Sequence, residues 1–406
     1  MRPPSYRVLL RQRDVGRLLL SAGLARLADR ILTLVLVLYA LVRFHSPLLA
    51  GWIGFAAIAP GLLVSPLAGV LFDRIGSAAA IAVDMACSAV CILALTMLAG
   101  AGTDTAWSLC LLVTLHSLTK PLSSAGVRSL LPTLVTPEYY DHANALDTTI
   151  QATVELFGPA LGGALFGLAG PVAAFSVIVV VYAAACTTLL RAAHRPTDPA
   201  SRNPGVWRDA TAGIVYVLRH RSLRTLALTY ACYQVSWGIL LVAVPVAVTR
   251  ALGGARGSAA VGILWAISGL GGAIGALATG QLGAIGRERS IVAFGILGTA
   301  LAICPVSMSF GFAGLASGLA LVGLFSGPID VAVLTLRQRR TDPTWLGRAI
   351  AVSMSLNMSG LPVGSALGGM LSGWSPAAAF AAAAGACLIA SAVAWAWLPS
   401  REPQDL

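Results

Sequence analysis

Charged residues are scarce in this 406-residue sequence, where Asp, Glu, Lys and Arg together make up 11%. Soluble domains average about 25%. Hydrophobic residues make up 57% of the chain. This balance excludes an ordinary soluble protein and predicts a polytopic membrane protein embedded in a lipid bilayer. The 43 glycines and 21 prolines lie within the apolar runs, where membrane helices tolerate them.

Motifs of enzymes and nucleic-acid-binding proteins are also missing. The seven cysteines form no CxxC pair, so we interpret them as small buried hydrophobes and expect no metal site. The sequence shows no catalytic triad or phosphate-binding loop. The net charge of +11 is spread over short loops, with no soluble domain to form a nucleic-acid groove. We therefore expect no enzyme, no nucleic-acid partner and no cofactor.

Twelve apolar stretches are long enough to cross a bilayer as helices, which takes about 20 residues each. They lie at residues 17–42, 48–72, 78–100, 106–131, 143–168, 171–191, 223–249, 259–282, 290–309, 313–336, 348–372 and 377–398. The sequence therefore predicts an all-α membrane protein with twelve transmembrane helices.

The basic residues give this chain an orientation. With the N-terminus inside, most of the 27 Lys and Arg residues fall on the cytoplasmic side. The opposite side receives only Arg43, Arg250 and Arg256. The positive-inside rule then places the N- and C-termini in the cytoplasm. We expect a multi-pass protein of the cell (plasma or inner) membrane.

An internal duplication indicates two similar halves. The segment GPALGGALFG begins at Gly158, and GSALGGMLSG begins 206 positions later at Gly364, with seven of ten positions identical. The predicted domains are an N-terminal six-helix bundle at 1–190, a central cytoplasmic linker at 191–222 and a C-terminal six-helix bundle at 223–406. Parallel halves of this kind enclose a central site. One chain then forms one transport path, which predicts a monomer.

Two motifs resemble those of the major facilitator superfamily. The turn after the second span resembles the superfamily's GxLxDRxG loop, and the fifth span resembles the GPxxGG core of its antiporter motif. The residues concerned are Gly69, Asp73, Arg74 and Gly76 in the loop, and Gly158, Pro159, Gly162 and Gly163 in the span. The first span and the RSLLPTLVTPEYYDHANAL connection are similar to its multidrug and macrolide efflux branch. The resemblance implies the major facilitator fold and alternating access, with a proton gradient as the energy source.

Two carboxylates in the first half are candidates for proton coupling. A charge at the bilayer centre costs about 2.5–3.5 kcal/mol, so such residues need partners or water. Asp29 shares a helical face with Arg26 and Arg30, and an intrahelical ion pair is the alternative to a functional role. Glu155 has only Gln151 on its face and no cation, so we expect it to exchange protons. Lys120 could still reach Glu155 and keep it ionised.

Asp330, in the tenth span, is a third candidate for proton coupling. The alternative is an ion pair with Arg337 or Arg128 near the inner face. Arg128 lies near the inner end of the fourth span, which favours a gate or anchor over a ligand contact. We group Arg26, Arg30, Lys120 and Arg128 as gate or ion-pair residues.

An aromatic and amide face is predicted for the seventh span. It consists of Tyr230, Tyr233, Gln234 and Trp237. Aromatic surface binds amphiphilic and cationic ligands without requiring one shape. Tyr39, Gln151 and Asn357 are further candidates for the substrate cavity. Ordinary packing between helices explains the same pattern.

The sequence thus favours a secondary active transporter that exports a lipophilic or cationic small molecule in exchange for protons. One alternative is a specific exporter or importer of a metabolite or siderophore. A non-transporting scaffold or sensor is the alternative from another class, because the second-half counterpart of the GxLxDRxG loop, Gly280 to Arg287, is degenerate.

Overall fold

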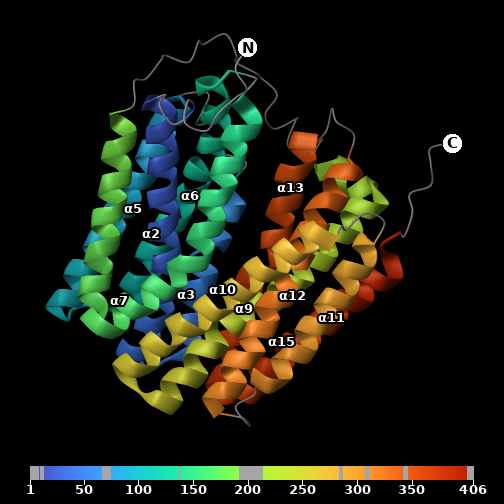
Figure 1. Ribbon diagram of the computed structural model, residues 1–406. Helices are drawn as coiled ribbons and strands as arrows, with labels where there is room; N and C mark the ends of the chain where they lie inside the picture. Colours follow the sequence, from blue (N-terminus) through green and yellow to red (C-terminus); the bar gives the residue numbers. More distant parts are fainter. Residues whose placement is uncertain are drawn as a thin grey trace. The chain divides into compact units, whose positions relative to one another are not determined.

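The structure is a computed structural model that describes residues 9, 13–65, 75–136, 139–191, 214–282, 287–306, 311–341 and 346–399. Its described residues form helices joined by short turns, with no strand among them. Figure 1 shows the helices in chain order by colour. The all-helical prediction is therefore confirmed.

Helices coincide with each of the twelve predicted spans wherever those spans are described. The first six spans correspond to α2 (Arg13–Arg43), α3 (Pro47–Ala56) with the short helix at 59–65, α5 (Ser77–Ala101), α6 (Ala106–Leu134) and the long α7 (Tyr140–Leu190). The other six correspond to α9 (Arg221–Leu252), α10 (Gly254–Leu282), α11 (Glu288–Val306), α12 (Gly311–Arg339), α13 (Leu346–Met358) with α14 (Gly360–Trp374), and α15 (Pro376–Trp397).

Gly170 divides α7 into the fifth and sixth predicted spans. Its backbone has φ 83° and ψ 174°, inside an otherwise helical run. Positive φ is accessible to glycine because it has no Cβ. Pro171 follows and has no N–H to continue the hydrogen bonds of the preceding helix. The break thus falls between the predicted bounds 168 and 171.

Seven helices of the described chain are long and apolar enough to cross a membrane on those criteria alone. The first span, α2, is not among them because Arg26, Asp29 and Arg30 interrupt its apolar sequence. Charged side chains inside a membrane helix normally face the bundle interior and pair with one another. The contacts of α2 are therefore central to the candidate site.

Grouping residues by their contacts divides the chain into two compact units. The first comprises Met1–Leu36 and Ala56–Val206, and the second comprises Val37–Phe55 and Trp207–Leu406. In the first unit α5 packs against α6 and α7. Side chains of α2 contact Met85 of α5 and Lys120 of α6. In the second unit α9 contacts α10, α13, α14 and α15. The predicted domain division stays a prediction, and residues 192–213 of its linker lie outside the described residues.

Glycines of the duplicated segment lie at equivalent helix contacts in the two units. A Cβ on Gly158 would stand 2.5 Å from Cβ of Arg30, and one on Gly162 would stand 3.1 Å from the Ile31 oxygen. In the second unit, Gly364 and Gly368 lie in the same way against the backbone of α9. Small residues let membrane helices approach closely. Both copies of the repeat therefore make the same kind of close helix–helix contact through glycines.

Candidate functional site

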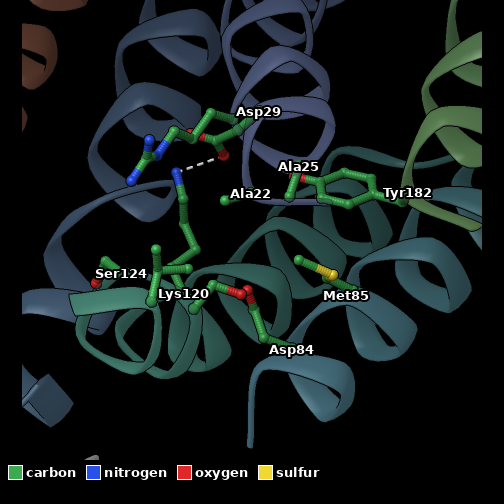
Figure 2. A pocket seen from close by; sticks show the side chains of 11 residues that line it. Ala22, Ala25, Asp29, Asp84, Met85, Lys120, Ser124 and Tyr182 are labelled. Atoms are coloured by element: carbon green, nitrogen blue, oxygen red, sulfur yellow. Dashed lines mark ion pairs between the residues drawn. The ribbon is translucent and has the colours of Figure 1, made fainter. Parts of the chain in front are cut away.

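The described structure contains a pocket inside the first unit, between α2, α5, α6 and α7. It has a volume of about 110 Å³. Figure 2 shows charged side chains of α2, α5 and α6 converging on it. Its lining residues are Ala22, Ala25, Arg26, Asp29, Asp84, Met85, Lys120, Ser123, Ser124, Val127 and Tyr182. Two carboxylates and two cations thus share one small cavity.

Asp29 and Lys120 form an ion pair across this pocket, drawn as the dashed line in Figure 2. The distance from Lys120 Nζ to Asp29 Oδ1 is 2.6 Å. The side chains of Asp29 and Lys120 remain 24% and 30% exposed, although the Asp29 Oδ1 atom itself is buried. The alternative of an intrahelical ion pair for Asp29 is therefore wrong, because the observed cation comes from α6.

His116 extends the ion pair deeper into the unit. Its Nε2 lies 3.4 Å from Asp29 Oδ1, and its Nδ1 lies 2.9 Å from the Ser88 hydroxyl. The ring is almost fully buried and packs edge-on against Tyr182 at 5.9 Å between centroids. A continuous row of polar groups therefore runs from Lys120 through Asp29 and His116 to Ser88.

Asp84 is the second carboxyl of the pocket. It is 4% exposed and faces the hydroxyls of Ser123 and Thr119. Its Oδ1 is buried without a hydrogen bond of good geometry, as is the Ser123 hydroxyl. No described residue forms an ion pair with Asp84. Asp84 therefore differs from Asp29, which is paired with a lysine.

Arg26 and Arg30 turn to α7 and not to Asp29. Arg26 makes two hydrogen bonds to the Asp147 carboxylate, at 2.6 and 3.1 Å. Arg30 Nη2 lies 2.9 Å from Glu155 Oε1, which also accepts from Gln151 at 3.3 Å. The expectation that Glu155 lacks a cation is therefore wrong. Glu155 is paired with a cation, as in the alternative, but the cation is Arg30 and not Lys120.

The antiporter-like motif positions one of these pairs. Gly158 lies against Arg30 and Gly162 against Ile31. The close approach of α7 to α2 leaves the Arg30 side chain beside Glu155, one helical turn before Gly158. Pro159 and Gly163 continue α7 through this contact. The motif thus holds two helices together at the level of an ion pair.

The inner-loop motif is described only at its end. Gly69, Asp73 and Arg74 lie outside the described residues. Gly76 precedes α5 and has φ 80° and ψ 150°, a backbone conformation that favours glycine. The latch expected from Asp73 and Arg74 stays a prediction.

In the second unit, Asp330 accepts a hydrogen bond from the Tyr230 hydroxyl at 2.5 Å. The alternative of an ion pair between Asp330 and Arg337 is not found among the described contacts, and the alternative with Arg128 stays a prediction. Arg337 is 2% exposed, and Asn357, with its amide turned so that the oxygen faces the guanidinium, accepts from it at 2.6 Å. The nitrogen of the same amide donates to the backbone carbonyl oxygen of Ser353 at 3.0 Å. Arg128 is exposed on α6, and its role as gate or anchor stays a prediction.

The aromatic face of α9 is assembled as a row of rings. Tyr230, Tyr233 and Trp237 follow one another with centroids 5.7 and 6.4 Å apart, and Trp237 stacks on Trp265 of α10 at 6.0 Å. Tyr230 and Trp237 are partly exposed, whereas Tyr233 and Gln234 are buried. Gln151 is exposed on α7 and Tyr39 is buried. Their roles in a substrate cavity stay predictions.

Sequence reasoning missed His116, Ser88, Asp84, Tyr182 and Trp265 as members of these clusters. A usable signal was present, because His116 and Lys120 are four residues apart, as are Asp84 and Ser88. Each pair therefore shares a helix face in an apolar span.

Comparisons with known proteins support a transporter. The chain matches the sequence profile of the Major Facilitator Superfamily over residues 18–282 and 226–406. It is 46% identical over 350 residues to the uncharacterized MFS-type transporter y4rN of Sinorhizobium fredii, covering 86% of each chain.

Solved structures with the same fold are distant in sequence. The nucleoside transporter NupG is 14% identical with a TM-score of 0.71, covering 94% of this chain and 98% of its own. A bacterial metal transporter is 19% identical with a TM-score of 0.66, covering 96% and 99%. A peptide transporter, POT, in complex with sulfate is 13% identical with a TM-score of 0.73, covering 95% and 94%. At these identities the likeness shows the fold alone.

Proposed function

Because the chain belongs to the Major Facilitator Superfamily and is a multi-pass membrane transporter of that type, we propose that it exports lipophilic or cationic small molecules in exchange for protons. The proposed activity is that of the multidrug and macrolide efflux branch. It works as a monomer in the cell membrane, with cytoplasmic termini and no bound cofactor.

The observation that carries this proposal is the Asp29–Lys120 ion pair at the pocket of the first unit. A cation that enters the pocket competes with the Lys120 ammonium for the Asp29 carboxylate. The pair is partly exposed, which leaves the carboxylate within reach of a ligand. Carboxylates inside membrane segments mark ion and substrate paths. Asp29 is accordingly the residue we assign to cation binding.

The row of rings on α9 fits the same class of substrate. Tyr230 and Trp237 present partly exposed aromatic surface, and aromatic faces attract organic cations without requiring one shape. Asp330, hydrogen-bonded to Tyr230, adds a negative group beside this surface. We propose that this row takes the apolar body of the substrate when it is bound in the second half.

The proposed cycle is alternating access, in which the two halves expose their sites to one side of the membrane at a time. Substrate binds from the cytoplasm and displaces a proton inward, and a proton from outside reloads the carrier. One charge moving across 100 mV supplies about 2.3 kcal/mol. A pH gradient adds to this driving force.

Transport in proteoliposomes tests the proposal. The purified full chain is reconstituted, a pH gradient is imposed, and the flux of tetraphenylphosphonium, a lipophilic monocation, is measured. We expect gradient-driven flux in the parent and its loss in Asp29→Asn. Asp14→Asn, the same chemical change at a half-exposed carboxyl near the start of α2, serves as the matched control and retains the flux.

Each other outcome contradicts a defined part of the proposal. Flux that ignores the pH gradient indicates a uniporter or another coupling ion. Equal flux in the parent, Asp29→Asn and Glu155→Gln excludes both predicted coupling sites. Absence of any cation flux favours a specific metabolite carrier or a non-transporting scaffold.

A further inference from the structure

Two carboxyls of the first-unit pocket share one available ammonium. Lys120 of α6 is paired with Asp29 of α2, while Asp84 of α5 has no ion pair within the described chain. Both carboxyls line the same cavity as Lys120, and in Figure 2 the Lys120 side chain extends toward Asp29. The arrangement therefore offers the ammonium two alternative partners.

An ionised carboxylate is costly to bury without a cation. Asp84 is 4% exposed, and its nearest polar neighbours are the hydroxyls of Ser123 and Thr119. A protonated carboxyl needs only neutral hydrogen-bonding groups of this kind. Asp84 lines the pocket, and its buried Oδ1 has no hydrogen bond of good geometry. The ammonium can therefore dock at this carboxyl after the proton has left.

The other charged groups around Asp84 are already engaged. On α2, Arg26 is held by both oxygens of Asp147, and Asp29 holds Lys120. His116 of α6 lies between Asp29 and the Ser88 hydroxyl, and Tyr182 of α7 is buried. Lys120 alone combines a long flexible stem with a rotatable ammonium. It is therefore the cation that can change partners.

We propose that Asp84 is the proton-binding site of the transport cycle and that Lys120 moves from Asp29 to Asp84 when a cationic substrate binds Asp29. This inference rests on the proposed function. In this step the Asp84 O–H bond breaks and its proton leaves toward the cytoplasm. The substrate cation takes the place of the ammonium at Asp29, and the ammonium neutralises the new carboxylate. One proton leaves for each positive charge bound, so the net charge of the pocket is unchanged.

Proton release from the detergent-purified full chain tests the inference. Tetraphenylphosphonium is added to weakly buffered protein, release is followed with a pH-sensitive dye, and bound cation is measured by equilibrium dialysis. We expect one proton released per cation bound in the parent, as linkage requires for a single exchanging site. Asp84→Asn should bind the cation and release none, whereas Asp14→Asn should behave as the parent.

Infrared difference spectroscopy keeps the inference testable if Asp84→Asn fails to fold. In the parent, binding of tetraphenylphosphonium should remove the carbonyl band of a protonated carboxyl. Asp84→Glu retains a carboxyl and should shift that band, because the band reports the side chain that carries the proton. No band loss in the parent, or an unshifted band in Asp84→Glu, would overturn the assignment.

Failure of the inference differs from failure of the proposed function. If the parent releases protons and a folded Asp84→Asn releases as many, coupling stands and Asp84 is not its site. If the parent binds no tetraphenylphosphonium, or binds it without any release, cation-for-proton exchange is excluded and the inference falls with it.

Discussion

Gly158 of α7 lies against the side chain of Arg30 of α2, so closely that a Cβ at residue 158 would stand 2.5 Å from Cβ of Arg30. The same helix turn presents Glu155 to the Arg30 guanidinium at 2.9 Å. A packing contact and an ion pair are thus parts of one helix crossing. Substitutions at Gly158 and at Glu155 therefore measure the packing contact and the ion pair separately.

Gly158→Ala should lower the thermal unfolding midpoint in detergent. The added methyl forces α7 away from α2, and overpacking of this kind costs about 1–3 kcal/mol. Gly385→Ala is the matched control, because a Cβ there meets nothing within 4 Å. Equal midpoints for Gly158→Ala and the parent would mean that α7 and α2 have room for a methyl group at residue 158, which contradicts the 2.5 Å approach.

Lys120→Met should destabilise the protein more than the double variant Lys120→Met/Asp29→Asn. The single change leaves a carboxylate without its ammonium, which costs about 1–3 kcal/mol, whereas the double change removes both charges. Thermal unfolding of the parent, both single variants and the double variant measures the coupling between the two residues. Strictly additive losses would show that the ion pair contributes nothing.

Asp147→Asn should be more damaging than Glu155→Gln. The side chains of Arg26 and Asp147 are 25% and 17% exposed and joined by two hydrogen bonds, whereas those of Arg30 and Glu155 are 45% and 47% exposed. We expect a loss of about 1–3 kcal/mol for the first and about 0–1 kcal/mol for the second. Unfolding midpoints in one detergent compare them, and the reverse order would contradict the geometry.

Asn357→Ala should destabilise the second unit. It removes the carbonyl oxygen that accepts from the buried Arg337 guanidinium at 2.6 Å. A buried charged group that loses its partner costs about 1–3 kcal/mol or more. Asn357→Asp retains the acceptor but loses the hydrogen bond donated to the Ser353 carbonyl, so it should lower the midpoint less than Asn357→Ala does. An equal fall for both variants would argue against this hydrogen bond.

The helices and their order could be predicted from the sequence because each span carries its own apolar signal. The break at Gly170 and the packing role of Gly158 and Gly162 were also accessible, since glycine and proline mark such places locally. These features depend on residues close together in the chain.

The pairing of charges could not be predicted, because it depends on which helices lie side by side. Spacing along α2 brings Arg26, Asp29 and Arg30 to neighbouring positions and suggests that they pair with one another. In the structure Asp29 turns to α6, and both arginines turn to α7. The place of Asp84 in the pocket could not be predicted either, because sequence alone does not show that α6 and α7 cover this turn of α5.

The conformation of Gly170 also has a stereochemical meaning. Reversing the signs of its φ of 83° and ψ of 174° gives −83° and −174°, which is ordinary extended backbone for an L-residue. Nothing lies within 4 Å of a Cβ added there. Handedness and not size therefore restricts the residue at the joint between the fifth and sixth spans. A D-alanine placed there by chemical synthesis should be accommodated, while its L-enantiomer should strain the turn.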